Sequence, residues 1–280
     1  MLQSVAESNS IKSTLALAPA VYIVGAGPGD PELLTVKAQR ILSQADVILF
    51  ADSLVPEQLL GMVRPEAEIV ATANQTLEEI LPIAIERVRS HKSVVRLHSG
   101  DPSLYSAIGE QMRLLSEANI PFEVIPGISA FQAAAAKLKV ELTVPGLVQT
   151  IILTRISGRT AVPPQEELAS LAAHQASLCL YLSARHVTSA QEKLLQHYPA
   201  QTPVAICYRL GWPDEEILIV PLAEMAATTQ ATKLIRTTLY VISPALAAEA
   251  ARSRLYHPEH AHLFRPARQT TETKQKDNLA

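Results

Sequence analysis

Three short apolar runs in the first half of the chain each end abruptly in a turn that contains glycine. They lie within residues 21–29, 94–103 and 122–130. Glycine lets the backbone turn where a Cβ atom would clash, and a helical pattern follows each turn. Strands that alternate with helices predict βαβ units and a mainly parallel sheet. Because ligands bind at the carboxyl ends of the strands in open α/β sheets, the three turns predict a binding site.

The second of these turns has the sequence Ser-Gly-Asp-Pro. Gly100 permits the turn, and Pro102 suits the first turn of a helix, where the N–H group that it lacks would be unpaired anyway. Asp101 would then lie beside the free N–H groups of that helix, either as a cap or as a ligand contact. The adjacent glycine and the nearby Tyr105 favour a loop that contacts a ligand.

Apolar periodicity predicts the other elements. In the first half we expect strands at 46–50 and 69–70, and helices at 33–42, 77–90 and up to residue 118. Pro82 fits the second of these helices only as a first-turn residue of a helix that starts late. In the second half we expect strands at 149–154, 177–182, 203–208, 216–220 and 238–242, and a helix at 186–198. A Gly/Pro/Asp turn at 210–214 predicts a hairpin, so this half combines helices with some antiparallel pairing.

A chain of 280 residues is longer than one average domain. A stretch with Pro and Gly at 139–148 is the expected linker between two α/β domains, at 21–138 and 149–244. We expect residues 1–20 to form a loose N-terminal extension. Residues 245–280 are expected to form a C-terminal tail with a polar, disordered end.

Composition narrows the possible partners and the compartment. With 48% hydrophobic and 18% charged residues the chain is an ordinary globular protein, and a net charge of −3 argues against binding nucleic acid or an anionic membrane. No apolar run approaches the roughly 20 residues of a membrane span, and the first twenty residues lack the features of a signal peptide. Cys179 and Cys207 lie in apolar strands, so we expect buried thiols and a reducing cytoplasm. The histidines of the part expected to fold show no compact metal spacing. His257, His260 and His262 lie close together, but they belong to the tail.

The first glycine turn invites comparison with dinucleotide-binding loops. That fingerprint places glycine at the first, third and sixth positions. Here the glycines are Gly25, Gly27 and Gly29, and the sixth position is Asp30. Asp52, about 20 residues further on, could take the place of the ribose-binding acid. A nicotinamide-dependent oxidoreductase therefore remains an alternative, although the glycine spacing disfavours it.

Three segments together resemble the tetrapyrrole methyltransferases, which use S-adenosylmethionine to methylate ring carbons of siroheme and cobalamin precursors. They are Val24–Thr35, Ser99–Pro102 with Tyr105, and Pro126–Ser129. Other features are similar to the subgroup that methylates C11 of precorrin-4 or cobalt-precorrin-4. These are Ala51–Val55, Glu141–Pro145, Gln149–Arg155, Gly158–Thr160, Trp212–Glu215, and the tail segment 253–266. The resemblance runs from about Val21 to Pro244, which is nearly all of the chain expected to fold.

The resemblance implies two α/β domains of the tetrapyrrole methylase type, with the active site in the cleft between them and a homodimeric assembly. It implies that residues of both domains contact S-adenosylmethionine, with S-adenosylhomocysteine as the product. Carried over position by position, these contacts are Pro28, Ser99, Gly100, Asp101, Leu104, Tyr105, Ser129, Ala130, Leu182, Cys207, Tyr208, Thr237 and Thr238.

The chain also departs from relatives that methylate uroporphyrinogen. Those enzymes carry a Lys shortly after the third strand, where this chain has Ala71–Asn74, so no lysine is available there to donate a proton. Residues 74–76 also differ from the pattern of the C11 subgroup, which leaves that edge of the substrate site open.

The chemistry of methyl transfer needs few catalytic groups, because the sulfonium of the donor is already electrophilic and placement of the acceptor carbon does most of the work. Asp52, at the end of a strand, is a candidate base for the ring proton, although its position favours a turn cap. Arg155, Arg159 and Arg209 are candidate anchors for the carboxylates of the macrocycle, since guanidinium pairs bidentately with carboxylate. Methyl transfer to another ring position of a precorrin or uroporphyrinogen, and a tetrapyrrole carrier without turnover, remain open alternatives.

Overall fold

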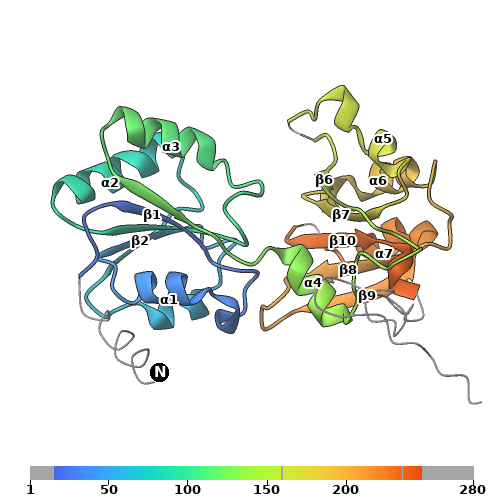
Figure 1. Cartoon of the computed structure of the whole chain (residues 1–280), viewed down its shortest axis with the longest axis horizontal. Coiled ribbons are helices and arrows are strands. Elements are labelled where there is room, and N and C mark those ends of the chain that lie inside the picture. Colours follow the sequence, from blue (N-terminus) through green and yellow to red (C-terminus); the bar gives the residue numbers. More distant parts are fainter. Residues whose placement is uncertain (1–15, 159, 235, 248–280) are drawn as a thin grey trace, which may run out of the picture. The chain divides into compact units, whose positions relative to one another are not determined.

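Five parallel strands form the first sheet of the computed structural model, which describes residues 16–158, 160–234 and 236–247. The strand order is β3-β2-β4-β1-β5, and every pair of neighbours is parallel (Figure 1). The strands are β1 (Val21–Gly25), β2 (Val47–Phe50), β3 (Glu68–Ala71), β4 (Val94–His98) and β5 (Phe122–Ile125). The predicted parallel sheet is confirmed, and its three glycine turns all lie at the carboxyl edge.

Helices cover both faces of this sheet. Alternate residues of the central strands point to opposite faces. On one face Val24, Ile48 and Leu97 pack against α1 (Val36–Leu42). On the other face Ile23 and Leu49 pack against helices from two segments. These are α2 (Leu77–Arg89) and α3 (Ile108–Glu117), which lie together above the sheet in Figure 1.

Helix α2 begins where it was predicted, whereas α3 does not. Helix α2 begins at Leu77, where the Glu79 carboxylate accepts a hydrogen bond of 2.7 Å from the Thr76 N–H group. Pro82 is therefore the sixth residue of the helix and not a first-turn residue. Helix α3 begins only at Ile108, so the expectation that Pro102 starts this helix is wrong. A run of turns separates β4 from α3, and Asp101 caps no α-helix.

The second sheet mixes parallel and antiparallel pairs, with the order β6-β7-β10-β8-β9. Strand β7 runs parallel to β6 and antiparallel to β10, so this half contains antiparallel pairing as expected. The two strands of the predicted hairpin, β8 and β9, are neighbours in the sheet. Its strands are β6 (Ile151–Arg155), β7 (Ser177–Tyr181), β8 (Pro203–Tyr208), β9 (Glu216–Pro221) and β10 (Thr238–Ile242). The remaining α-helices are α4 (Ala130–Leu138), α5 (Leu168–Ala172), α6 (Val187–Leu194) and α7 (Met225–Ala231). Cys179 and Cys207 are free, fully buried thiols in these strands, as predicted.

The chain forms two compact units. Among the described residues, the first contains the chain up to Lys137, together with Cys207–Leu218 and Leu234–Leu239. The second contains Leu138–Ile206, Ile219–Lys233 and the described residues from Tyr240 onward. Two short segments of the second half therefore belong to the first unit, and one of them places Trp212 beside Gly29.

The start of the described chain packs onto the first sheet. Leu17 packs against the buried cluster that contains α1, and the Ala20 carbonyl accepts a hydrogen bond of 2.9 Å from the Val94 N–H group. The Tyr22 hydroxyl donates to the Ala18 carbonyl at 3.1 Å. Residues 17–20 are thus part of the first unit, although the sequence analysis placed them in a loose extension.

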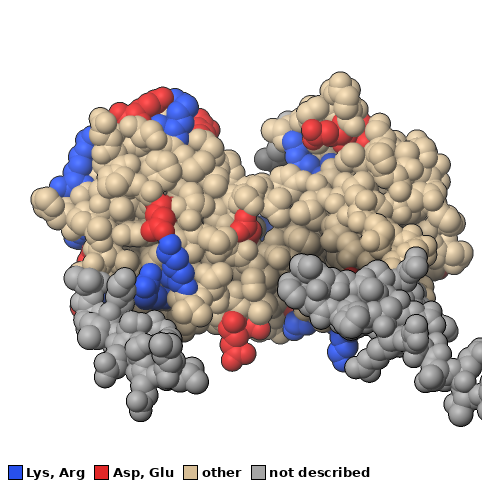
Figure 2. Space-filling view, viewed as in Figure 1, with Lys and Arg blue, Asp and Glu red and all other residues tan. Residues whose placement is uncertain are grey.

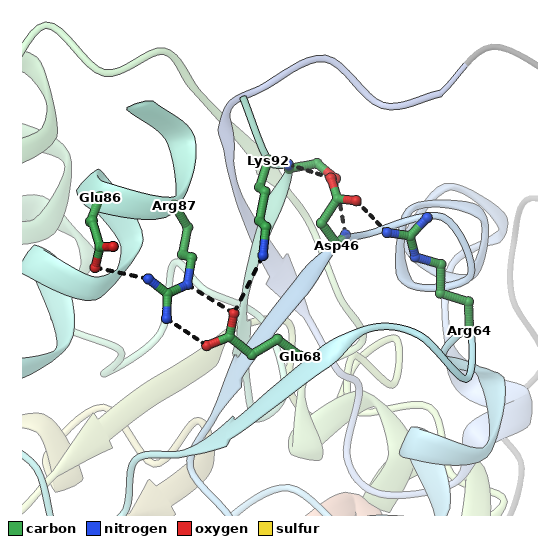
Figure 3. A network of polar contacts seen from close by, with 7 residues as sticks. Asp46, Arg64, Glu68, Glu86, Arg87 and Lys92 are labelled. Atoms are coloured by element: carbon green, nitrogen blue, oxygen red, sulfur yellow. Dashed lines mark hydrogen bonds and ion pairs between the residues drawn. The ribbon is translucent and has the colours of Figure 1, made fainter. Parts of the chain in front are cut away.

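A polar network fixes the amino ends of β2, β3 and β4, opposite the glycine turns (Figure 3). Asp46 accepts hydrogen bonds of 2.7 Å from both the N–H and the hydroxyl of Ser93, and it forms an ion pair with Arg64. Glu68 binds the guanidinium of Arg87 through both carboxylate oxygens, each at 2.8 Å. Burial raises the pKa of Asp46, but the contacts with Ser93 and Arg64 outweigh it and hold that pKa below its ordinary value.

Charged side chains are dispersed over one face of the molecule (Figure 2). On the face shown in Figure 2, Lys and Arg lie interspersed with Asp and Glu, and neither sign forms a continuous patch. None of the described helices is long and apolar enough to cross a membrane.

Candidate active site

The three glycine turns meet at the carboxyl edge of the first sheet. A Cβ atom on Gly127 would lie 2.2 Å from the carbonyl oxygen of Gly100, and one on Gly25 would lie 2.6 Å from Cα of Gly127. Neither contact is possible for a larger residue, so the loops after β1, β4 and β5 approach as bare backbone. We call Gly25, Gly100 and Gly127 the glycine contact.

Hydrogen bonds fasten the first two of these loops. Gly27 and Gly100 form an isolated antiparallel bridge, with the Gly27 N–H donating at 3.2 Å and the Gly100 N–H at 2.7 Å. The Ala26 N–H donates to the His98 carbonyl at 2.7 Å. A dinucleotide-binding loop directs such amides toward a pyrophosphate. Here the amides of Ala26 and Gly27 are consumed within the protein, which argues against the nicotinamide alternative.

Asp101 connects the second and third glycine turns. Its Oδ2 accepts a hydrogen bond of 2.8 Å from the Gly127 N–H, and its Oδ1 accepts one of 2.8 Å from the Ser103 N–H. Burial raises the pKa of this carboxyl group, but the hydrogen bonds from Ser103 and Gly127 outweigh it and leave the pKa below its ordinary value. The ionised carboxylate therefore caps a turn and joins two loops. It does not cap a helix, which was the alternative to the favoured ligand loop.

The other cofactor residues expected in the first half follow the same three strands. Pro28 is buried in the loop after β1, while Leu104 and Tyr105 lie in the turns after β4. Ser129 is buried after β5, where its N–H group donates to the Gln132 side chain at 2.9 Å, and Ala130 begins α4. The structure thus brings these residues to one edge of one sheet.

Strained backbone conformations mark several of the expected site residues. Residues other than glycine rarely adopt a positive φ, and such strain gathers at ligand sites. Five of the positive-φ residues lie within three positions of the end of an α-helix, where this conformation is ordinary. These five are His91, Asn119, Lys139, Gln175 and Lys233.

The other positive-φ residues lie beside strands or in the turns after β4. Leu182 (φ 52°) directly follows β7, and its side chain is 67% exposed. Arg209 (φ 45°) directly follows β8, and Thr237 (φ 54°) directly precedes β10. Tyr105 (φ 55°) and Ala107 (φ 49°) lie between β4 and α3. All but Ala107 are residues that the sequence analysis assigned to the site.

The remaining cofactor residues expected in the second half occupy the same strand ends. Cys207 and Tyr208 close β8, and Thr238 opens β10. The Arg209 N–H donates to the Thr237 carbonyl at 2.9 Å, which joins these two strand ends within the first unit. Burial raises the pKa of the Cys207 thiol to about 12, so this side chain stays neutral.

Of the three candidate arginine anchors, Arg159 lies outside the described residues. The guanidinium of Arg155 donates to the backbone carbonyls of Thr160 at 2.9 Å and Ala161 at 3.1 Å. These bonds fold the loop after β6 back onto its own strand. Arg155 therefore positions this loop, and much of its hydrogen-bonding capacity is already used.

Arg209 is also engaged within the protein. Its guanidinium stacks 4.0 Å from the ring centroid of Trp212 and forms an ion pair with Asp214. The Trp212 ring in turn covers the glycine loop after β1, because a Cβ atom on Gly29 would lie 2.5 Å from Cδ1 of the indole. Arg209 thus holds Trp212 over Gly29, all within the first unit.

Asp52 is exposed just after β2. Its Oδ1 accepts a hydrogen bond of 3.1 Å from the Ala73 N–H group, which follows β3. This contact joins two neighbouring loops at the carboxyl edge, as a turn-capping carboxylate would. The side chain remains accessible from that edge.

Sequence reasoning missed two polar side chains inside β4. Arg96 and His98 point to the same face of the sheet, and His98 is only 8% exposed. Burial and the charge of Arg96 lower the pKa of His98 to about 4, so the imidazole is neutral at pH 7. The signal was present in the sequence, since a cation in the middle of a central apolar strand is unusual. Within the described residues, no group of three His, Cys, Asp or Glu side chains could hold a metal ion.

Comparison with known proteins defines the class of protein to which this chain belongs. The family model of the tetrapyrrole (corrin/porphyrin) methylases matches residues 20–226, and the chain belongs to this family of methyltransferases. Its relatives include the precorrin-4 C(11)-methyltransferase of Pseudomonas aeruginosa, which is 47% identical over 88% of this chain and 98% of that protein. The cobalt-precorrin-4 C(11)-methyltransferase of Methanocaldococcus jannaschii is 43% identical over 88% of this chain and 95% of that protein.

Solved structures agree with this assignment. A cobalt-precorrin-4 methyltransferase superimposes with a TM-score of 0.79 at 41% identity, over 81% of this chain and 96% of that one. A uroporphyrin-III C-methyltransferase from Thermus thermophilus, solved with S-adenosylhomocysteine, gives a TM-score of 0.69 at 27% identity, over 81% of this chain and 99% of that one. The two-domain α/β fold expected from the resemblance is confirmed.

Proposed function

We propose that this enzyme transfers a methyl group from S-adenosylmethionine to C11 of precorrin-4 or of its cobalt form, in the assembly of the corrin ring. The observation that carries this proposal is similarity at 40–47% identity, over 82–88% of the chain, to several relatives with that one activity. Choice of ring position depends on how both halves of the protein orient the macrocycle, and the similarity extends through both.

The cofactor side of the proposal rests on the glycine contact and the strained strand ends. The loops after β1, β4 and β5 offer Pro28, Ser99, Gly100, Leu104, Tyr105, Ser129 and Ala130, while Asp101 holds two of these loops together. From the strand ends of the second sheet come Leu182, Cys207, Tyr208, Thr237 and Thr238. S-adenosylmethionine supplies an electrophilic methyl group when bound, so these residues need only orient it. Orientation alone can contribute about 7–11 kcal/mol.

Asp52 serves in this proposal as the base that removes the ring proton. It is exposed at the carboxyl edge, and the loop after β3 holds it through the Ala73 N–H group. Arg155 positions the loop after β6, and Arg159 belongs to the same loop. Arg209 acts by placing Trp212 over Gly29.

The assembly and the compartment are part of the same proposal. We infer a homodimer, as the family resemblance implies, and a cytoplasmic location, because two free, buried cysteines suit a reducing compartment. Sedimentation of the purified protein tests the first of these.

The activity is tested by incubating the enzyme with precorrin-4 and methyl-labelled S-adenosylmethionine. A singly methylated product with the label at C11 is the expected result. Label at another ring position would assign the enzyme to a different member of the family, and a bound tetrapyrrole without turnover would make it a carrier. Co-purification of a nicotinamide nucleotide would instead support the oxidoreductase alternative.

A further inference from the structure

The guanidinium of Arg96 is a partly buried charge without a counter-ion. Arg96 is the third residue of β4, where it shares a row of the sheet with Ile23 of β1 and Leu49 of β2. Within the described residues no ion pair includes Arg96, and its one hydrogen bond runs from Nη1 to the Thr72 hydroxyl at 2.9 Å. Its Nε is enclosed without a partner. Burial lowers the pKa of this group, which reflects the cost of keeping a cation away from water.

The Thr72 contact shows where the guanidinium lies. Leu49 pairs with Val70 of β3, so Thr72 stands two residues beyond the row of Arg96 and on the far side of β2. The side chain therefore extends toward the carboxyl edge and crosses β2 to reach the loop after β3. Ala73, the next residue of that loop, donates to Asp52. Arg96 thus lies under the two loops that hold the candidate base.

The strand order divides the carboxyl edge into two halves. The glycine contact gathers the loops after β4, β1 and β5, which are neighbours in the sheet. Asp52 and Thr72 follow β2 and β3, on the other side of β4. The cofactor loops proposed above occupy the first half. The charge of Arg96 is directed into the second half, where the methyl acceptor would lie.

The chemistry of this group selects its ligand. A partly buried guanidinium binds a carboxylate far more favourably than a neutral group, since the pair offsets the cost of desolvation. Nη2 has no partner among the described residues, and the hydroxyl proton of Thr72 can donate to the same carboxylate, because its oxygen already accepts from Nη1. The neutral His98 beside it adds no competing charge.

We propose that Arg96, with Thr72, is a receptor for a carboxylate side chain of the tetrapyrrole and holds the ring beside Asp52. The proposal rests on the proposed function for its choice of ligand. It also gives the charge of Arg96 a counter-ion. The candidate anchors Arg155 and Arg209, in contrast, already have carbonyl, aromatic and carboxylate partners within the protein.

The test compares wild-type enzyme with Arg96→Gln, Arg96→Lys and Thr72→Ala. Equilibrium dissociation constants are measured separately for precorrin-4, for its methyl-esterified analogue and for S-adenosylhomocysteine. Loss of a charge-assisted pair should weaken precorrin-4 binding about ten- to a hundred-fold in Arg96→Gln. Arg96→Lys should recover part of this loss, and Thr72→Ala should show a smaller loss in a protein that keeps the guanidinium. Arg113→Gln removes an exposed arginine of α3 and is the matched control.

The esterified analogue separates a direct contact from a structural effect. Wild type and Arg96→Gln should bind it equally, because the carboxylate is gone. A difference that persists with the ester, or unchanged binding of precorrin-4, would overturn the proposal. Weaker S-adenosylhomocysteine binding alone would assign the carboxylate to the cofactor and also overturn it. Wild-type protein that binds precorrin-4 without methylating it would contradict the proposed function and leave the Arg96 comparison valid.

Discussion

Asp101 and Gly127 are joined by a hydrogen bond of 2.8 Å that links the loop after β4 to the loop after β5. We expect Asp101→Ala to lower the free energy of unfolding by about 1–3 kcal/mol, since it leaves two backbone N–H groups without their acceptor. Cofactor affinity should fall as well, because the loops lose a cross-link. Asp101→Asn keeps one acceptor oxygen and should lose less stability. Chemical denaturation and calorimetric titration measure both effects, and an unchanged unfolding curve for Asp101→Ala would contradict this account.

A second prediction concerns the effect of the glycine contact on stability. Gly127→Ala would place a Cβ atom 2.2 Å from the Gly100 carbonyl oxygen, so we expect a loss of about 3 kcal/mol or more. Gly109→Ala is the matched control, because nothing lies within 4 Å of a Cβ atom there and the residue is in helix α3. That change should stabilise the protein by about 0.5–1 kcal/mol. Equal effects of the two substitutions would show that the loops do not approach as described.

Asp46 should contribute to the pH dependence of stability. Its folded-state pKa is held below the ordinary value of 3.8, so its contribution is full above that value and is lost as the pH falls through the folded-state pKa. We expect Asp46→Asn to be less stable than wild type at pH 7, and the difference should shrink on acidification below about pH 4. Urea unfolding between pH 7 and pH 3 measures this. A difference that is constant with pH would rule out the carboxylate as its source.

Leu182 combines an exposed apolar side chain with a strained backbone. Leu182→Gly should stabilise the fold by up to about 1 kcal/mol, because glycine adopts φ near 50° without strain. It should at the same time weaken binding of S-adenosylhomocysteine. Leu182→Ala should weaken binding without the gain in stability. Lys233→Gly relieves a similar φ of 57° just after helix α7 and should gain stability with cofactor affinity unchanged.

Asp52→Asn tests the candidate base. If this carboxylate accepts the ring proton, kcat should fall by a factor of about 10²–10⁴. Affinity for S-adenosylhomocysteine should stay at the wild-type value, because Asp52 lies on the β2–β3 half of the edge. The amide oxygen can still accept from Ala73, so the melting temperature should change little. Wild-type turnover by this variant would exclude Asp52 as the base.

Local patterns in the sequence were enough to predict the framework of this protein. Short β-branched runs, glycine turns and apolar helical faces each act over a few residues, and they located the strands of both sheets and the parallel pairing of the first. The same patterns placed three turns at one sheet edge. They failed at the start of α3, because the turns after Asp101 continue to Ala107. They also failed for Pro82, which is accommodated inside α2 and does not lie in its first turn.

Contacts between distant segments required the tertiary structure. Asp101 binds the N–H of Gly127, Trp212 covers Gly29, and the Arg96 guanidinium reaches Thr72 across β2. No periodicity encodes such pairs, because they depend on which strands become neighbours and on the register between them. A residue type states what a side chain can bind. Only the fold decides whether that capacity is already used within the protein, as it is for Arg155 and Arg209, or remains available, as it does for Arg96.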